Sequence, residues 1–334
     1  MKMPFLPYLF TLCITLAPIC GQIHVSPAGN DHSAGKSGSP VRTFGKALEL
    51  SRQEGNPKDI RFAKGTYFLG GTIRLDGRDN GLKMTGGAGA VLSGGIRVQG
   101  WKEWERGIWR AEEPSAGHVR ELFIRSQRAN RARFPGKGWL RIEKSHPDRR
   151  SGFTYNQGDL PHHIEVAKGL ELVFLHDWSI SRIPVASIQP KTRMLEAAFP
   201  IGCEAPHYAI DHFEKQPRYA LEGSLELLDQ PGEWAGRDGF LYYLPKQGED
   251  MRKIQAIVPK LGRLLEISAG KDGKRPEDIK MDGLTFAHCR WDIPKEGYAS
   301  GQASMHEYRD GTGKKAGSSF PSQCKSPEHP EFPL

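Results

Sequence analysis

The chain has 334 residues, 37% of them hydrophobic, and a formal net charge of +8, which is enough for one large β domain or two domains. Its 39 glycines and 24 prolines indicate a fold with many tight corners. After the first 21 residues no apolar run is long enough to cross a bilayer, which excludes an internal membrane span.

Residues 1–21 have the pattern of a secretory signal peptide. Lys2 gives a positive start, residues 5–19 are nearly all apolar, and Cys20 precedes a polar sequence. Three prolines in this stretch argue against a buried helix, while a lipid anchor on Cys20 stays an alternative. We therefore expect export, to the periplasm or outside the cell, with a mature chain that begins near Gln22.

Residues 22–101 predict a capped stack of short strands. A strand at 23–25 leads through a polar Gly/Ser loop into an amphipathic helix that carries Phe44, Ala47, Leu48 and Ser51 on one face. From residue 59 to 100, short apolar pairs alternate with polar residues between Gly-rich corners, with no helical pattern between them. Strands this short must stack in rungs to bury a core, which predicts a parallel β-helix with the helix as its cap; a small β-sandwich is the alternative.

Residues 102–245 have longer, aromatic-rich strands, typical of an antiparallel sheet or sandwich. The rung pattern returns in residues 246–302, where IKMDGLTF repeats the layout of LKMTGGAG at residue 82. We therefore expect an all-β chain: a parallel β-helix with an inserted antiparallel β domain and a disordered or out-of-frame tail at 303–334. The core of the insert is expected on these side chains: Trp109, Phe123, Phe174, Trp178 and Tyr242.

Five segments, taken in order, resemble right-handed parallel β-helix proteins of the glycoside hydrolase family 141 type. The segments are SPAGND (26–31), SGGIRVQGW (93–101), ANRARFP (129–135), DQPGEW with LYYLP (229–245) and IKMDGLTFAHCRWDIPKEGYASGQA (279–303). The resemblance implies a secreted glycosidase acting on plant or algal polysaccharide, with fucosidase or xylanase activity. It also implies that the catalytic carboxylates belong to later rungs, so we expect a truncated chain that is inactive by itself.

No catalytic residue can be assigned from the sequence. Glycoside hydrolysis needs two carboxyl groups that flank the scissile bond. Asp282 lies inside a strand pattern, and Asp177 with Trp178 ends another, but a structural role accounts for each of these. His288, Trp291 and Asp292 follow the last clear rung and are the candidate substrate-binding residues at the start of a groove.

No cofactor and no metal are expected. The cysteines that follow the first 21 residues, at 203, 289 and 324, lack the spacing of metal ligands. Asn30 and Asp31 predict a turn rather than a calcium loop, because no spaced carboxylates follow them.

A basic stretch at residues 120–150 accounts for most of the net charge, with ten Lys or Arg against three Asp or Glu. It indicates either an acidic polysaccharide or oligosaccharide as partner, or a solvated strand face on which Arg131 and Arg133 tie the inserted domain to the solenoid. A signal peptide and the lack of a nucleic-acid motif argue against nucleic acid. A polysaccharide lyase on the same fold and a non-catalytic glycan-binding or surface protein stay as alternative functions.

Overall fold

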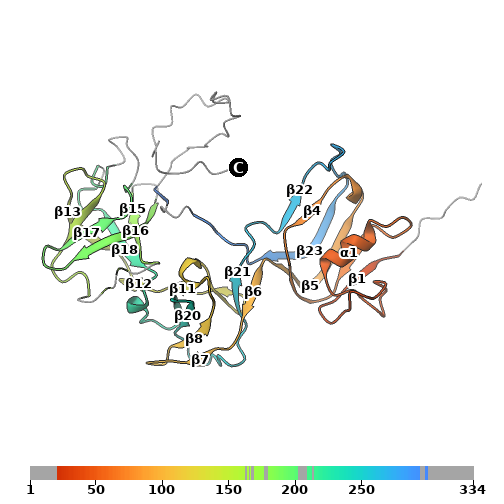
Figure 1. Cartoon of the computed structure of the whole chain (residues 1–334), viewed down its shortest axis with the longest axis horizontal. Coiled ribbons are helices and arrows are strands. Elements are labelled where there is room, and N and C mark those ends of the chain that lie inside the picture. Colours follow the sequence, from red (N-terminus) through yellow and green to blue (C-terminus); the bar gives the residue numbers. More distant parts are fainter. Residues whose placement is uncertain are drawn as a thin grey trace, which may run out of the picture. The chain divides into compact units, whose positions relative to one another are not determined.

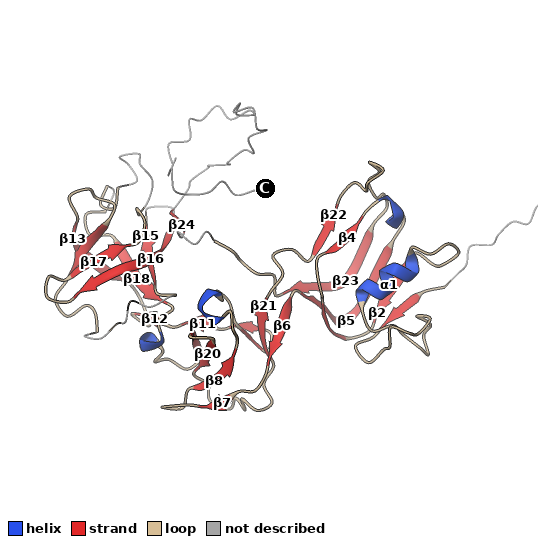
Figure 2. Cartoon of the chain, viewed as in Figure 1, coloured by secondary structure: helices blue, strands red, loops and turns tan. Residues whose placement is uncertain are grey.

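The computed structural model describes residues 21–161, 164, 166, 169–176, 180–201, 209–212, 214–293, 298 and 299. The described chain is all-β with few helices (Figure 2). The predicted signal sequence up to residue 20, Trp178 and the predicted tail lie outside the described residues. Among the described helices, none combines the length and the apolar character needed to cross a membrane.

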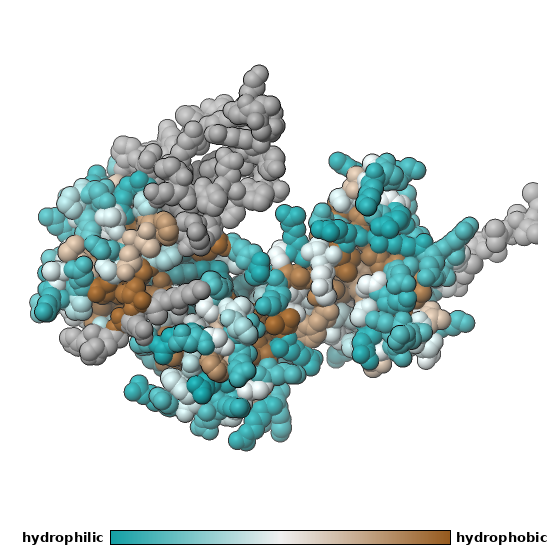
Figure 3. Space-filling view, in the orientation of Figure 1, coloured by the Kyte–Doolittle hydropathy of each residue, from teal (hydrophilic) through white to brown (hydrophobic). Residues whose placement is uncertain are grey.

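The chain divides into two compact units, each described here by itself. Unit 1 comprises the described part of Met1–Gly94 with Arg263–Cys289, and unit 2 comprises the described part of Gly95–Gly262 with Arg290–Leu334. In the view of Figure 3 the surface of both units is mostly hydrophilic, with smaller hydrophobic patches on each.

Unit 1 consists of short strands in parallel ladders, with one helix against them (Figure 1). Its elements are β1 (Ile23–Val25), α1 (Phe44–Ser51), β2 (Asp59–Phe62), β3 (Gly65–Phe68), β4 (Ile73–Leu75), the 3-10 helix η1 (Gly77–Asp79), β5 (Lys83–Ser93), β22 (Leu265–Ile267) and β23 (Lys280–Ala287).

The main sheet of unit 1 has the order β1-β2-β5-β23, with β3 also paired to β5, and all of these pairings are parallel. Ile23 lies beside Ile60, Ile60 beside Met84, and Met84 beside Met281, so apolar side chains stack from strand to strand. A second parallel pair joins β4 to β22. The pairs β4–β22 and β5–β23 each join the two chain segments of unit 1, which lie far apart in the sequence.

The helix α1 buries the face that its sequence predicts. Phe44, Ala47, Leu48 and Ser51 are all buried, and the Phe44 ring packs edge-on against Phe62 of β2 at 5.2 Å between centroids. Thr43 caps the helix because its hydroxyl accepts a hydrogen bond from the Lys46 N–H.

Asp31 belongs to the same corner of unit 1. Its Oδ1 accepts hydrogen bonds from the backbone N–H groups of Arg42 at 2.7 Å and Thr43 at 2.9 Å, and Oδ2 accepts one from the Thr43 hydroxyl at 2.9 Å. These bonds lower the pKa of Asp31 against the opposing effect of burial. Asp31 therefore fixes the backbone directly before α1 by accepting its hydrogen bonds.

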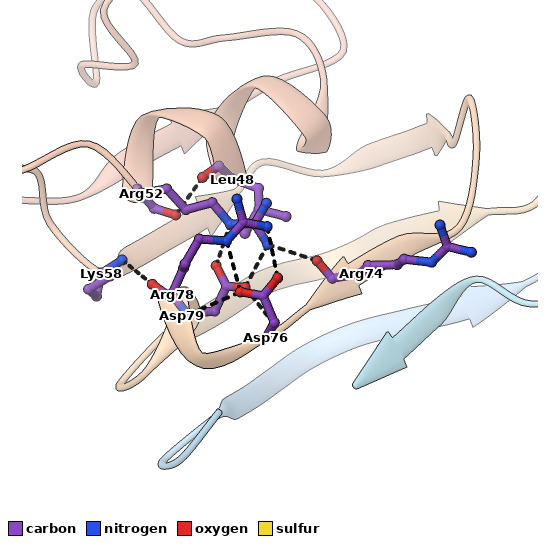
Figure 4. A network of polar contacts seen from close by, with 8 residues as sticks. Leu48, Arg52, Lys58, Arg74, Asp76, Arg78 and Asp79 are labelled. Carbon is purple, nitrogen blue, oxygen red and sulfur yellow. Dashed lines mark hydrogen bonds and ion pairs between the residues drawn. The ribbon is translucent and has the colours of Figure 1, made fainter. Parts of the chain in front are cut away.

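A buried ion pair joins α1 to the corner between β4 and β5 (Figure 4). Asp79, which is fully buried, accepts two hydrogen bonds from Arg52, from Nε at 2.8 Å and from Nη2 at 2.6 Å. The same guanidinium donates to the Arg74 carbonyl at 2.8 Å, and the Asp76 N–H donates to Asp79 Oδ2 at 2.9 Å. The helix and the corner between β4 and β5 are thus fixed to each other through the Asp79 carboxylate.

Unit 2 is built from antiparallel sheets with one short parallel pair. Its elements are β6 (Gly95–Val98), β7 (Lys102–Glu103), β8 (Trp109–Glu112), η2 (Ala116–His118), β9 (Phe123–Ile124), β10 (Gln127–Arg128), β11 (Asn130–Arg131), β12 (Arg133–Phe134), β13 (Leu140–Ser145), β14 (Gly152–Tyr155), β15 (Glu171–Leu175), β16 (Ile180–Gln189), β17 (Met194–Ala197), β18 (Arg218–Glu222), η4 (Leu225–Leu227), β19 (Glu233–Arg237), β20 (Phe240–Tyr243), β21 (Ala256–Pro259) and β24 (Tyr298–Ala299).

Six strands of unit 2 close into an antiparallel barrel, where the sequence predicted an open sheet or a sandwich. The pairings run β13-β14-β17-β16-β15-β18 and return from β18 to β13. The interior holds Phe153, Phe174 and Tyr219, with the ring centroids of Phe153 and Tyr219 4.6 Å apart. Alternation along a strand shows which residues face inward but not which strands pair, so the closure is invisible in the sequence.

Two further strands, β12 and β24, pair with the barrel strands β18 and β16. The other strands of unit 2 form two smaller sheets, ordered β11-β19-β20-β8-β7 and β10-β9-β21-β6. Their buried residues make a second core, which includes Trp101, Trp234 and Tyr243. The five side chains expected to share one core are therefore divided: Phe174 and Tyr242 belong to the first core, and Trp109 packs against the second.

We expect Asp79→Asn to destabilise unit 1 by about 3–5 kcal/mol, because the amide leaves the Arg52 guanidinium without its buried counter-charge. Glu49→Gln on the same helix is the matched control, since it removes only the exposed pair with Lys46 and should cost about 0–1 kcal/mol. Differential scanning calorimetry of the two variants measures the difference. Equal transitions in both variants would contradict the role given to this ion pair.

Candidate functional site

The structure brings together two of the three candidate residues. Trp291 and Asp292 line a cavity of about 260 Å³ in unit 2. His288 belongs to unit 1 and is not among the lining residues; its Nδ1 lies 2.8 Å from Ser93 Oγ, and burial lowers its pKa. His288 also has a positive φ of 58°, so it turns the chain directly after β23.

Charged side chains surround the cavity, and Trp291, 46% exposed, supplies a large aromatic surface. Asp292 is paired with Arg290 at 2.8 Å between Oδ1 and Nε. Lys260 is more loosely held, with Nζ 3.7 Å from Glu113 Oε1. The lining residues are Ser115, His118, Val119, Arg120, Glu121, Pro259, Lys260, Arg290, Trp291 and Asp292.

The position of Trp291 is fixed by its backbone and by two guanidinium groups. Its N–H donates to Oε2 of the buried Glu121 at 3.3 Å, and Glu121 Oε1 lies 2.8 Å from Arg128 Nη2. The guanidinium carbons of Arg120 and Arg182 lie 4.9 Å and 5.9 Å from the indole centroid. Cations at this distance are attracted to the negative face of the ring, so they hold the indole in place.

Behind Trp291, two buried glutamates lie directly opposite each other on neighbouring strands of the barrel. Glu171 of β15 pairs in register with Glu222 of β18, and they are 7% and 9% exposed. Arg120 forms a bidentate ion pair with Glu171, and Arg131 Nη1 lies 2.7 Å from Glu171 Oε2. Burial raises the pKa of Glu171, but Arg131 and Arg120 outweigh it and bring the pKa to about 2.

Glu222 has two arginines of its own. Arg182 Nη1 lies 2.5 Å from Glu222 Oε2, and Arg133 Nε lies 3.8 Å from Oε1. Arg120 and Arg182, the two cations beside the indole, therefore each bind a different member of the glutamate pair. The arginines beside the Trp291 indole are therefore themselves held by the buried glutamates of the barrel.

One glycine makes room for this network. Gly223 has a φ of +94°, and a Cβ atom there would lie 2.3 Å from Arg131 Nη2 and 2.2 Å from the Gly169 carbonyl oxygen. The same Arg131 atom donates to that carbonyl at 2.9 Å. A side chain at residue 223 is incompatible with both the backbone conformation and the arginine contact.

The geometry favours binding over proton transfer. A glycosidase needs one carboxyl that gives up a proton, and a pKa of about 2 keeps Glu171 ionised at neutral pH. Glu121 and Asp292, the carboxylates among the described lining residues, are each engaged by an arginine. What the cavity offers is an aromatic face with hydrogen-bonding groups around it.

The basic stretch at 120–150 is largely neutralised by ion pairs. Six of its ten cationic side chains have a carboxylate partner within 4 Å among the described residues, and both Arg131 and Arg133 tie short strands to the barrel. The six are Arg120, Arg128, Arg131, Arg133, Arg141 and Arg149. The stretch is therefore chiefly a structural feature, in which Arg131 and Arg133 join elements within unit 2.

The other sequence candidates do not join the cavity. Asp282 is exposed on β23, and Asp177 with Trp178 lies outside the described residues. No group of three His, Cys, Asp or Glu in the described part of the chain could hold a metal ion.

Sequence reasoning missed Arg120, Glu121 and Lys260 as lining residues, and the pairing of Glu171 with Glu222. One signal was present, because Glu171 is a single charge inside the apolar run LELVFL. A charge buried in such a strand requires a partner. The partners themselves come from residues 40 to 51 positions away, which a single sequence does not specify.

Comparison with known proteins identifies the fold. No protein-family model matches the chain, and no curated protein does. A solved structure titled "Glycoside hydrolase" matches with a TM-score of 0.68 at 24% identity, over 82% of this chain and 53% of that one. A second, titled "The complex structure of XylC with xylose", has a TM-score of 0.32 at 14% identity, over 82% of this chain and 36% of that one.

The first match shows a glycoside hydrolase-like fold. This chain spans about half of the length of that protein, 53%.

We expect acid to destabilise unit 2 through Glu171. Its folded pKa of about 2 lies below the ordinary 4.5, so its contribution to stability is complete above pH 4.5 and is lost as the pH falls toward 2. That difference corresponds to about 3 kcal/mol at about 1.36 kcal/mol per pKa unit. Urea unfolding of unit 2 between about pH 6 and about pH 3 measures the greater part of it, about 2 kcal/mol.

The comparison needs two variants. Glu171→Gln should flatten the dependence of the urea midpoint on pH, whereas Glu143→Gln, which removes an exposed pair with Arg193, should leave the slope of the parent. A Glu171→Gln slope equal to that of the parent would show that acid acts elsewhere.

Proposed function

We propose that this chain binds carbohydrate, with the Trp291 indole as the surface on which a sugar ring stacks. The observation that carries the proposal is a half-exposed indole, with two guanidinium carbons 4.9 Å and 5.9 Å from its centroid, in a cavity lined by hydrogen-bonding side chains. The C–H face of a pyranose is apolar, and its rim of hydroxyls needs donors and acceptors. The ring and the charged residues around it meet these two requirements.

The fold supports the same class of ligand. A glycoside hydrolase-like architecture is consistent with a saccharide as ligand, although at 24% identity the likeness itself concerns the fold alone. We propose that the chain is related to the family 141 type, with unit 1 as part of a right-handed parallel β-helix. The parallel ladders of β1, β2, β5 and β23 are what such a solenoid requires.

We further propose that the chain is exported and meets plant or algal polysaccharide outside the cytoplasm. The support is the positive start and the apolar stretch within residues 1–21. Catalysis is not part of the proposal for this chain, because the described carboxylates near Trp291 are engaged by arginines.

We expect Trp291→Ala to weaken binding of a soluble plant or algal polysaccharide at least about tenfold, which corresponds to about 1.4 kcal/mol. The matched control is Trp139→Ala. Trp139 is also exposed, at 37%, and also lies against an arginine, Arg133 at 4.6 Å, but it does not line the cavity. Isothermal titration calorimetry against a panel of xylans, fucose-containing polysaccharides and uronate polymers measures both.

Two results would contradict the proposal. One is an equal loss in the two variants, and the other is an absence of binding to every member of the panel by the parent protein. Release of sugars would show that the chain is a catalyst, and products that absorb in the ultraviolet would identify a lyase.

A further inference from the structure

A second cleft in unit 2 has a composition unlike that of the Trp291 cavity. Its volume is about 600 Å³, and it lies where β6 ends and where β21 begins. Three cationic side chains and no carboxylate are among the described residues that line it. The lining residues are Arg97, Val98, Gln99, Gly100, Trp101, Met251, Arg252, Lys253, Ile254, Gln255 and Ala256.

The chain positions Trp101 at this cleft by a turn. Val98 and Ala256 are buried cross-strand partners of β6 and β21, and Gly100, with a φ of +73°, then reverses the chain. The indole of Trp101 enters the core beside Tyr243, with ring centroids 6.4 Å apart, and is 8% exposed.

The indole nitrogen of Trp101 is buried without a hydrogen-bond partner among the described residues. Indole N–H is a donor only, and a buried donor without an acceptor costs about 1–3 kcal/mol. Trp101 is also among the residues that line the cleft, so its N–H signal can report on a ligand bound there.

The positive charge at the cleft is available to a ligand. Arg252 makes no ion pair with a described carboxylate, and its guanidinium carbon lies 5.8 Å from the Trp109 ring. Lys253 pairs only loosely with Asp250, at 3.6 Å, and both side chains are more than half exposed. Such an exposed pair contributes about 0–1 kcal/mol, so it yields readily to a ligand anion.

We propose that this cleft binds the sulfate or carboxylate group of an acidic saccharide. The oxyanion accepts from the side chains of Arg252 and Lys253, while the amides of Gln99 and Gln255 serve the neighbouring hydroxyls. The part of the inference that names a saccharide rests on the proposed function. The volume is within the range of small-molecule sites, about 300–1,000 Å³.

A nucleic acid fits the cleft less well. Proteins that bind single strands stack bases on exposed aromatic rings, and the aromatic ring at this cleft, Trp101, is buried in the core. The amide groups of two glutamines suit a polyhydroxylated ligand instead.

The test follows the indole N–H signals of the full chain by proton–nitrogen correlation spectroscopy. The sequence has seven tryptophans, and Trp101→Phe and Trp291→Phe assign the two signals of interest. The probes are inorganic sulfate, a sulfated galactan oligosaccharide, an oligogalacturonate, a neutral xylo-oligosaccharide and a single-stranded oligonucleotide. The binding variant is Arg252→Gln with Lys253→Gln, which leaves Trp101 and the core intact. The control is Lys137→Gln with Lys144→Gln, which removes the same charge at exposed positions outside the cleft.

An acidic oligosaccharide should shift the Trp101 signal saturably, at a concentration at least tenfold below that needed with sulfate. The Arg252 and Lys253 double variant should weaken this at least tenfold, and the control should not. An unmoved Trp101 signal, or an equal loss in the control, would overturn the site. Equal affinity for sulfate or tighter binding of the oligonucleotide would overturn the saccharide assignment. The neutral oligosaccharide tests the Trp291 signal separately. An unmoved Trp291 signal would contradict the proposed function, whereas an unmoved Trp101 signal with the acidic oligosaccharides would contradict this inference.

Discussion

Two negative charges side by side in a barrel wall are the constraint on which much of unit 2 depends. Glu171 and Glu222 face each other across β15 and β18 with less than a tenth of either residue exposed. Burying one carboxylate without compensation costs several kcal/mol, and a like charge in the adjacent position adds to that. The chain meets this constraint with four arginines from β11, β12, β16 and the segment before β9. Arg131 and Arg133 thereby attach the short strands β11 and β12 to the barrel by charge, and β12 is also paired with β18 through its backbone.

The same network explains why an aromatic ring can stay exposed and ordered on this surface. An exposed indole loses conformational freedom only when its neighbours hold it, and Arg120 and Arg182 are themselves fixed by their glutamates. The position of the Trp291 indole therefore depends on two arginines that are held by the buried pair of glutamates. In unit 1 a single ion pair also holds two elements together, since Arg52 and Asp79 join the helix α1 to the corner between β4 and β5.

The sequence predicted those features that depend on local pattern. The buried face of α1 follows from the spacing of Phe44, Ala47 and Leu48, and the short alternating pairs of residues 59–100 became parallel ladders. The all-β class followed from the same alternation. His288 belongs to a different unit from Trp291 and Asp292, so its place in one site with them stays a prediction.

Within unit 2, features that depend on pairing between distant segments could not be predicted. The closure of the barrel and the pairing of Glu171 with Glu222 require knowledge of which strands are neighbours. The basic stretch shows the same limit, because its net charge is visible in the sequence but the carboxylates that neutralise it lie elsewhere in the chain. Charge counts along a sequence therefore overstate the charge that a partner meets.

The division of unit 1 into two chain segments has a consequence for the order of events during synthesis. The strand β5 is made early, but its neighbour β23 follows only after the 168 residues of Gly95–Gly262, that is 262 − 95 + 1. At about 5–20 residues per second this is a delay of about 8–34 s. Throughout that interval one whole edge of β5 has no partner strand from its own chain. Unit 2 can form its barrel and both cores within the same period, since residues 95–262 contain all six barrel strands. Unit 1 is thus completed last, and the time needed to synthesise residues 95–262 of unit 2 determines the delay.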